Sequence, residues 1–219
     1  MPIRITRNDS LKTGYFLSLE GGEGAGKSTQ NRRIVEWLTG QGREVVETRE
    51  PGGTVVSEQI RQVLLDTRNQ GLNATAELLL MFAARSQLVG EVILPALASG
   101  KVIVCDRFAD ASYAYQGGGR ELGRKAVAMV EQLVLNDLQP DLTLLFDIPV
   151  RLGMSRVAER GEVDRFEVES MQFFERVRSA YLERAEADPG RFRVIDASKS
   201  EEDVWQQVEA LLKTEQLGV

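Results

Sequence analysis

The sequence predicts an α/β protein of three layers, in which helices flank both faces of a five-stranded parallel sheet. Two observations lead to this fold class. Five short apolar runs are bounded by turn residues, and their hydrophobicity is continuous rather than alternating, which is typical of strands buried on both faces. The segments between the runs have helical period, and this alternation indicates right-handed crossovers between parallel strands.

The expected strands are these apolar runs. In chain order they are YFLSLE 15–20, EVVET 44–48, KVIVCD 101–106, LTLLFD 142–147 and FRVID 192–196. Parallel sheets of this kind bind ligands beyond the carboxyl ends of their strands. We therefore expect the functional residues in the loops that follow the runs.

The expected helices lie between and after the strands. They cover 28–42, 57–66, 74–98, 123–138 and 200–213. The first places Ile34 and Leu38 on one face and ends near Gly40 and Gly42, which is a typical C-terminal stop. The third is apolar and rich in alanine.

One domain is expected over residues 14–219, preceded by a loose leader over 1–13. The leader is polar and mildly basic and has no apolar centre, which is not the pattern of a signal peptide. No run of about 18 apolar residues is present, so we expect no contact with a membrane and a cytoplasmic protein.

The charge and the rare residue types argue against several classes of function. The formal net charge is −6 and no long Lys/Arg tract is present, which argues against a nucleic acid polymer as a partner. Histidine is absent, so the commonest general base and the commonest metal ligand are missing. The single cysteine, Cys105, lies in an apolar run and is expected in the core of a protein from a reducing compartment.

The segment GGEGAGKST, residues 21–29, matches the phosphate-binding pattern G-x-x-x-x-G-K-[ST] between an expected strand and an expected helix. Its glycines permit positive φ, so that backbone N–H groups and the positive end of the helix can surround a phosphate. Lys27 would reach the β- and γ-phosphates, and the Ser28 hydroxyl would bind Mg²⁺. The pattern predicts a P-loop NTPase-type fold that binds a nucleoside triphosphate.

The acceptor of the phosphoryl group is a separate question. The sequence has no N-K-x-D tetrapeptide for reading guanine, and its length is short for a motor ATPase. A kinase of small molecules is therefore favoured. A kinase of another nucleoside monophosphate and a nucleotide-binding switch remain as alternatives.

Four further clusters follow or connect the expected elements: TREPGGT 48–54, CDRF 105–108, AYQGGGR 114–120 and ERGEVDRFE 159–167. In the second, Asp106 can hold Mg²⁺ through water and Arg107 can bind a phosphate with two donors. The fourth has the composition of a solvated surface segment or of a lid that excludes water during transfer. The first three clusters also fit, in order, a plain turn, a structural ion pair and a helix-entry loop.

These motifs together resemble bacterial thymidylate kinase, a family of P-loop nucleoside monophosphate kinases. The segments EGGEGAGKST, TREPGGT, LLMFAAR, CDRFADASYAYQGGGR, QPDLTLLFD and RGEVDRFE occur in the family's order and spacing, over about residues 15–210. The resemblance implies ATP-dependent, Mg²⁺-requiring phosphorylation of dTMP to dTDP by a homodimer. It also implies a small lid at about 153–167.

The resemblance assigns the donor side of the site. The ATP phosphates would be bound by Gly21, Gly22, Glu23, Gly24, Ala25, Gly26, Lys27, Ser28 and Thr29, with Arg156 nearby. Mg²⁺ would be held by Ser28, Asp106 and Glu50. Arg160 matches the lid arginine and is expected to neutralise charge in the transition state.

The resemblance also assigns the acceptor side. Arg107 and Arg49 would hold the dTMP phosphate, with Glu50 at the point of transfer. The remaining expected substrate contacts are Glu23 near the sugar and phosphate, Pro51, Arg61, Tyr115 against C2′, and Arg85, Ser112 and Gln116 at the thymine edge.

One position departs from the family's pattern. Many relatives have a phenylalanine four residues before the thymine-reading arginine, whereas here Phe82 lies three residues before Arg85 and Met81 lies four before it. Both offsets fall near one helix face, and we expect Phe82 to cover the thymine. The dTMP phosphate oxygen is already an anion, so the expected in-line attack on ATP needs no strong base and depends on Lys27, Mg²⁺, Arg107 and Arg160.

Overall fold

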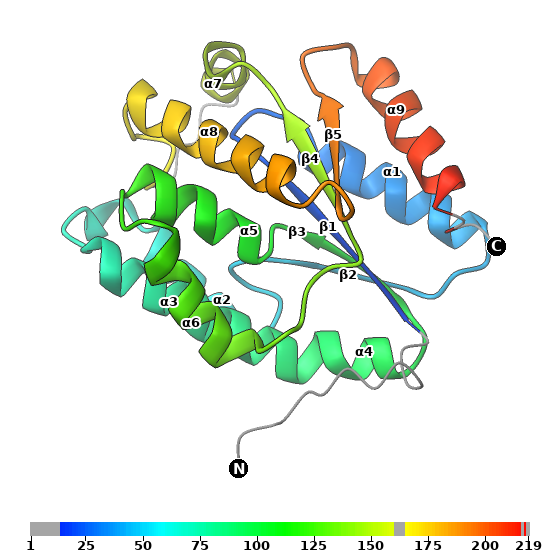
Figure 1. Cartoon of the computed structure of the whole chain (residues 1–219), viewed down its shortest axis with the longest axis horizontal. Helices are drawn as coiled ribbons and strands as arrows, with labels where there is room; N and C mark the ends of the chain where they lie inside the picture. Colours follow the sequence, from blue (N-terminus) through cyan, green and yellow to red (C-terminus); the bar gives the residue numbers. More distant parts are fainter. Residues whose placement is uncertain (1–13, 160–164, 216, 218–219) are drawn as a thin grey trace.

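A computed structural model describes residues 14–159, 165–215 and 217 of this chain. Its strands form one parallel sheet in the order β2-β3-β1-β4-β5 (Figure 1). The strands are β1 Tyr15–Gly21, β2 Val45–Arg49, β3 Val102–Asp106, β4 Leu142–Asp147 and β5 Phe192–Asp196. The expected fold class is confirmed, and every strand begins and ends within one residue of the apolar run that predicts it.

The central strand β1 is buried on both faces. It pairs with β3 and with β4, so that Leu17 lies opposite Val104 on one side and Leu142 on the other. Phe16, Leu17 and Leu19 are fully buried. This explains why the run is apolar without alternation.

Two helical layers cover the sheet (Figure 1). On one face, α1 Lys27–Gly40 and α9 Glu201–Thr214 pack through Ile34 and Val208 against the side of β1 that carries Leu17. A layer with more helices covers the opposite face of the sheet. There Phe16 and Ile103 pack against the helices that lie between β2 and β4 in the chain. Alternate residues of each strand therefore support different layers.

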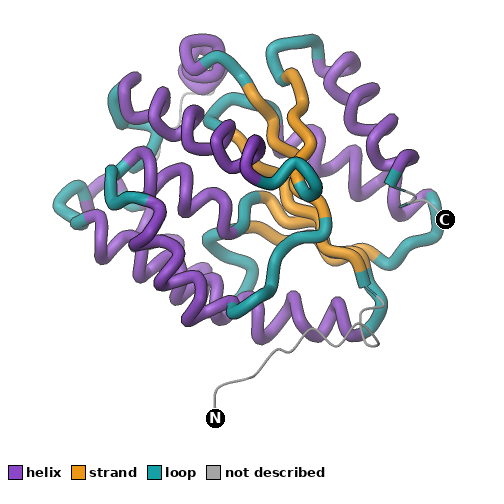
Figure 2. Tube along the Cα trace, in the orientation of Figure 1, coloured by secondary structure: helices purple, strands orange, loops and turns teal. Residues whose placement is uncertain are grey.

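The larger layer contains most of the remaining helices (Figure 2). Their bounds are α2 Val55–Leu65, α3 Ala74–Leu88, α4 Leu94–Ala98, α5 Ala109–Ser112, α6 Arg124–Leu135, α7 Val150–Ala158 and α8 Met171–Ala187. A short 3₁₀ helix covers Thr67–Asn69, and π-helical segments cover Val89–Ile93 and Tyr113–Gly119.

Three sequence-based expectations change. The single helix expected over 74–98 is divided by a π-helical turn into α3 and α4, which overall periodicity does not distinguish. The segment 114–120, which fits a helix entry, is mostly π-helical. Helix α8 was not predicted as a separate element, although its buried Phe173, Val177 and Tyr181 have helical spacing.

Ala74–Ala98 is also the one stretch of the described residues long and apolar enough to cross a membrane by length and composition, with a mean hydropathy of 1.4. Only 39% of that window is buried inside the molecule. The stretch carries two fully buried ionic side chains, Glu77 and Arg85, and packs against the sheet through Phe82 and Leu88. These contacts are typical of a core helix in a globular domain.

Glycines allow α8 to lie directly on the π-helical segment Tyr113–Gly119. A Cβ atom added to Gly119 would lie 2.5 Å from Cε2 of Phe173, whereas the nearest atom to one added to Gly117 would be Cγ2 of Val127 at 3.5 Å, an ordinary contact distance. A contact below 3 Å between carbon atoms forces the two elements apart.

We expect Gly119→Ala to lower the free energy of unfolding by about 1–3 kcal/mol, because the added methyl group overpacks this interface. Gly117→Ala is the matched control and should stay within about 0.5 kcal/mol of wild type. Urea denaturation monitored by circular dichroism measures both. Equal stability of the two variants would contradict the packing argument.

Candidate functional site

A cavity of about 620 Å³ opens at the carboxyl ends of β1, β2 and β3, where the expected motifs converge. The loop between β1 and α1 lines it with residues 23–29. The other expected site residues that line it are Arg49, Glu50, Pro51, Arg61, Asp106, Arg107, Tyr115 and Arg156. The structure therefore brings most of the predicted site into one space.

The glycine loop forms an anion-binding turn. Gly24 and Gly26 have φ of 69° and 78°, in the left-handed region that glycine adopts without strain. Gly26 precedes α1 and offers no side-chain cap, whereas α2, α3, α8 and α9 all begin with a capping side chain. The first N–H groups of α1 are left for a ligand, as in a phosphate site.

Lys27 lies folded back over this loop. Its Nζ donates to the carbonyl oxygens of Gly21 at 3.2 Å and Gly22 at 3.1 Å. These two glycines lie next to the cavity but are not part of its lining. Burial, and then the charge of Arg107, lower the pKa of Lys27. A bound polyphosphate would offer Lys27 a stronger partner and favour its charged form.

Arg107 connects the end of β3 to the glycine loop. Its backbone has a φ of 71°, a strained conformation that is typical of functional sites. Its guanidinium donates to the Gly21 carbonyl at 2.8 Å and to Glu23 at 2.8 Å, and it lies 4.8 Å from the ring centre of Tyr115. The Tyr115 hydroxyl donates to the same Glu23 oxygen at 2.6 Å.

Glu50 and Arg85 form a buried ion pair behind the cavity wall. Nε of Arg85 donates to Oε2 of Glu50 at 2.7 Å, and its other nitrogens donate to Ser112 Oγ and to the Phe108 carbonyl, both at 3.1 Å. Burial raises the pKa of Glu50, against the charge of Arg85. Arg85 is 2% exposed and Ser112 is 1% exposed, so neither lines the cavity.

The expectation for Phe82 needs a correction. Met81 lines the cavity, whereas Phe82 is 1% exposed and packs into the core, with its ring 4.4 Å from the Arg85 guanidinium. Consecutive side chains on a helix point about 100° apart, and the packing of α3 against the sheet turns Phe82 into the core and leaves Met81 at the cavity. Gln116 is also fully buried and outside the lining.

Three expected arginines have further contacts or lie outside the described residues. Arg49 lines the cavity, yet its side chain is 54% exposed and its guanidinium pairs with Glu58 at 3.1 Å. Arg61 donates to the Pro51 carbonyl at 2.8 Å. Arg160, together with Glu162 and Asp164 of the expected lid, falls in 160–164, outside the described residues.

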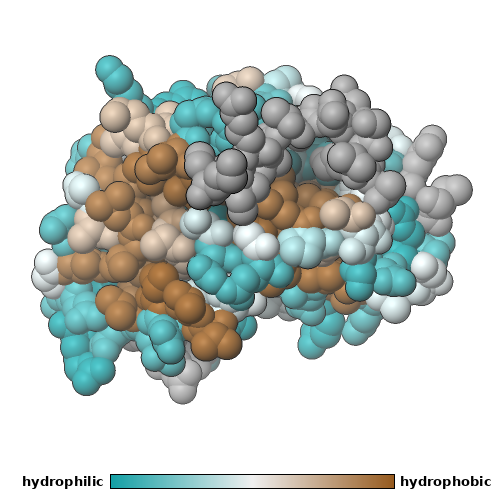
Figure 3. All heavy atoms as spheres, turned by 90° about the horizontal axis from the view of Figure 1, so that it is seen from below, coloured by the Kyte–Doolittle hydropathy of each residue, from teal (hydrophilic) through white to brown (hydrophobic). Residues whose placement is uncertain are grey.

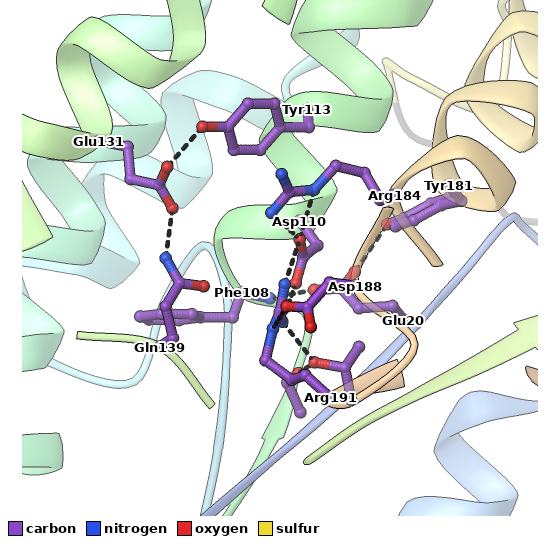
Figure 4. A network of polar contacts seen from close by, with 12 residues as sticks. Glu20, Phe108, Asp110, Tyr113, Glu131, Gln139, Tyr181, Arg184, Asp188 and Arg191 are labelled. Carbon is purple, nitrogen blue, oxygen red and sulfur yellow. Dashed lines mark hydrogen bonds and ion pairs between the residues drawn. The ribbon is translucent and has the colours of Figure 1, made fainter. Parts of the chain in front are cut away.

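A buried polar network lies beneath the site, and none of the motifs in the sequence points to it (Figure 4). Glu20 is fully buried and accepts from the Phe108 backbone N–H and the Tyr181 hydroxyl, both at 2.7 Å. The Tyr181 hydroxyl in turn accepts from Arg107 at 3.2 Å. The helical period of 171–187 could have identified Tyr181, but no local signal marks Glu20 within an apolar strand.

Burial raises the pKa of Glu20 to about 8, with a further contribution from the nearby charge of Asp110. Asp110 is itself held ionised, because Arg191 and Arg184 donate to it at 2.6 Å and 2.7 Å (Figure 4). The two acids therefore differ in protonation near neutral pH, and the proton on Glu20 is part of the folded network.

The fold and the geometry of the site together define the class of protein to which this chain belongs. A parallel sheet whose central strand leads into a glycine loop and an uncapped helix is the architecture of P-loop nucleotide-binding proteins, and arginines facing that loop across a cavity are typical of phosphotransferases.

Comparison with known proteins narrows the class. A sequence model described as thymidylate kinase matches residues 19–208. A thymidylate kinase of Pseudomonas syringae pv. tomato is 55% identical over 200 residues, which cover 91% of this chain and 95% of that protein. One from Pseudomonas fluorescens is 53% identical over 202 residues, covering 92% and 96%. The crystal structure of thymidylate kinase from Ehrlichia chaffeensis superposes with a TM-score of 0.75 at 32% identity, covering 91% and 98%.

The chain belongs to the thymidylate kinase family. Enzymes of this family phosphorylate dTMP to dTDP with ATP, so the expected family and reaction are confirmed. The alternatives of another nucleoside monophosphate kinase and of a nucleotide-binding switch are not supported. The roles of individual residues remain predictions.

We expect Glu20→Gln to change how stability depends on pH. The folded-state pKa of Glu20 is raised, so its contribution is fully present below its ordinary pKa of about 4.5 and is lost as pH rises through about 8. The amide does not titrate, so wild type should lose stability relative to the variant between pH 5 and pH 8. Urea denaturation at both pH values measures the difference, and parallel pH profiles would refute it.

Proposed function

We propose that the chain transfers the γ-phosphoryl group of ATP to dTMP within this single cavity, by in-line attack of the dTMP phosphate. The observation that carries the proposal is that Lys27 and Ser28 on one side, and Arg49 and Arg107 on the other, line one space of about 620 Å³. Phosphate-binding groups from three strand ends can therefore meet a donor and an acceptor together.

The donor nucleotide binds along the glycine loop toward β5. Backbone N–H groups at the start of α1 hold the polyphosphate, and Lys27 exchanges the carbonyl oxygens of Gly21 and Gly22 for phosphate oxygens. Arg156 donates to the Ala197 carbonyl at 3.1 Å and also lines the cavity, so it marks the nucleoside end of the donor subsite.

The residues near the loop fit a magnesium ion. The buried oxygens Oδ1 of Asp106 and Oε1 of Glu50 have no hydrogen-bond partner among the described residues, and Ser28 offers a hydroxyl at the same cavity. No cluster of three acidic, Cys or His side chains occurs in the described ranges, which suits an ion held mainly by phosphate oxygens and water. When bound, Mg²⁺ would neutralise charge on the phosphates.

The acceptor binds on the side of β2 and β3. Arg107 binds the dTMP phosphate and exchanges part of its contact with Glu23 for it, while Arg49 moves from its exposed pair with Glu58. Tyr115 lies against the sugar, where its ring leaves no room for a 2′-hydroxyl. Met81 faces the base from α3.

The chemistry needs placement and positive charge rather than a base. The attacking phosphate oxygen is already anionic. The buried Lys27 and the partly buried Arg107 are cations positioned by backbone and carboxylate contacts before substrate arrives. Family resemblance assigns Arg160 the same task in the transition state. Its position lies outside the described residues, so its role stays a prediction.

A second copy of this chain is the proposed partner. Helices α2, α3 and α6 pack side by side and expose Val56, Val63, Leu79, Met129 and Leu133 by 45–84%. Figure 3 shows apolar side chains gathered on the face seen from below, where these helices lie. A patch of this kind favours an interface, and the family resemblance favours a homodimer. We also expect the enzyme to be cytoplasmic.

We expect Lys27→Ala and Arg160→Ala each to lower kcat by at least about a hundredfold with dTMP as acceptor, because each removes a cation from the transition state. The measurement is the rate of ADP formation in a coupled assay, which is compared among the acceptors dTMP, dUMP, dCMP, dGMP and dAMP. Replacing Mg²⁺ with EDTA should abolish turnover in wild type. Near-normal kcat in a folded variant would rule out the role assigned to that side chain.

We expect Leu133→Glu, at a position 84% exposed on α6, to shift the protein toward monomer because a charge cannot be buried against a second copy. Val194→Glu, 51% exposed on the edge strand β5, is the matched control and should keep the wild-type mass. Sedimentation velocity at micromolar concentration distinguishes them. A monomeric wild type would exclude the proposed dimer.

A further inference from the structure

The carboxylate of Glu77, in the first turn of α3, is a fully buried acceptor shared by three side chains. Oε1 accepts from Nε2 of Gln116 at 2.8 Å. Oε2 accepts from Arg165 at 2.7 Å and from Nε of Arg120 at 3.2 Å. Glu77 therefore connects α3 to the π-helical segment Tyr113–Gly119 and to the segment after residue 164.

The ionic part of this cluster is balanced without a ligand. Arg165 is 3% exposed and also donates to the Leu64 carbonyl at 2.7 Å, so it is a structural cation rather than one free for phosphate. Arg120 pairs with both Glu77 and Glu169. Charge neutralisation alone explains why an acid is buried at position 77. It does not explain why that acid also binds Gln116.

The hydrogen bond to Glu77 determines the orientation of the Gln116 side-chain amide. An ionised carboxylate accepts hydrogen bonds and cannot donate them, so the NH₂ group of Gln116 must face Glu77. The amide oxygen Oε1 then faces the opposite way. It is buried and has no hydrogen-bond partner among the described residues. An unpaired buried acceptor of this kind is rare unless a ligand or water completes it.

Gln116 is itself buried outside the cavity lining, but it adjoins residues that form the cavity wall. Gln116 directly follows Tyr115, which lines the cavity, and its π-helical segment continues from α5, whose last residue Ser112 carries the hydroxyl bound by Arg85. Phe166, which lines the cavity beside Tyr115 at 5.8 Å between ring centres, is held by the Arg165 guanidinium 4.6 Å from its ring. The Glu77 cluster therefore supports the wall that faces the base.

We propose that Glu77 is a specificity-determining positioning residue, which holds Gln116 so that only an acceptor oxygen is available to the base. Thymine carries a donor, N3–H, that can satisfy this oxygen. Cytosine carries an unprotonated nitrogen at the same position, so two acceptors would face each other without a proton. The inference rests on the proposed assignment of Gln116 to the thymine edge.

Glu77→Gln tests the inference at almost constant shape. A glutamine at 77 can donate as well as accept, so Gln116 becomes free to rotate and offer its NH₂ group. The ratio of kcat/KM for dTMP to kcat/KM for dCMP should fall at least about tenfold, mainly through KM, because the buried acceptor is no longer fixed. The KM for ATP should stay within about twofold of wild type.

Asp110→Asn is the matched control, because Asp110 is also a fully buried acid held by two arginines, and its side-chain hydrogen bonds among the described residues go to Arg184 and Arg191 rather than to Gln116. Both variants should lose stability, yet only Glu77→Gln should change the dTMP/dCMP ratio. An equal fall in both variants would mean a general loosening of the fold and would overturn the inference.

Gln116→Leu separates this inference from the assignment beneath it. A higher KM for dTMP in Gln116→Leu, together with a wild-type ratio in Glu77→Gln, overturns the role of Glu77 alone. An unchanged KM for dTMP in Gln116→Leu removes the assignment of Gln116 and the inference with it.

A measurement on the wild-type protein covers the case in which Glu77→Gln does not fold. With glutamine labelled by ¹³C and ¹⁵N, saturation with dTMP should shift the Gln116 side-chain carbonyl carbon and leave its NH₂ protons nearly unchanged. A large shift of the NH₂ protons instead would show that the amide donates to the base, which contradicts the inference.

Discussion

The catalytic end of this protein depends on one backbone constraint. The loop after the central strand must present the first N–H groups of α1 without a capping side chain, and this requires left-handed glycines at 24 and 26. Gly24 is constrained twice, since a Cβ atom there would lie 2.0 Å from the Gly153 carbonyl oxygen of α7. The first N–H groups of a helix that begins uncapped at a cavity are open to an anion or water, and a phosphate group fits them.

Buried charge is the second organising feature. Arg107, Arg85 and Lys27 are cations in a desolvated region, and each is held by a carboxylate or carbonyl group before any substrate binds. Beneath them, Asp110 with its two arginines and the protonated Glu20 connect β1, α5 and α8 (Figure 4). Preorganised cations of this kind need little rearrangement when charge develops during phosphoryl transfer.

Much of the fold and part of the site were predictable from local sequence. The strands were found because burial on both faces leaves an uninterrupted apolar run, and the phosphate loop because its glycines and lysine must occupy set positions. The choice between Met81 and Phe82 was not predictable, because consecutive helical residues differ by only 100° and the orientation of α3 depends on its packing against the sheet. The role of Glu77 as a shared acceptor was also not predictable, because its hydrogen-bond partners come from the distant positions 116, 120 and 165.

Residue types at short, fixed spacing specify the alternation of strands and helices, the phosphate-binding loop and the kinase family, so these features can be identified before any packing is known. Only the tertiary structure decided the strand order β2-β3-β1-β4-β5, which places the ends of β2 and β3 beside the loop of β1. It also decided which of the expected side chains reach the cavity and which serve as buried supports. The physical reason is that these outcomes depend on packing and charge pairing between segments far apart in the chain, which local periodicity does not encode.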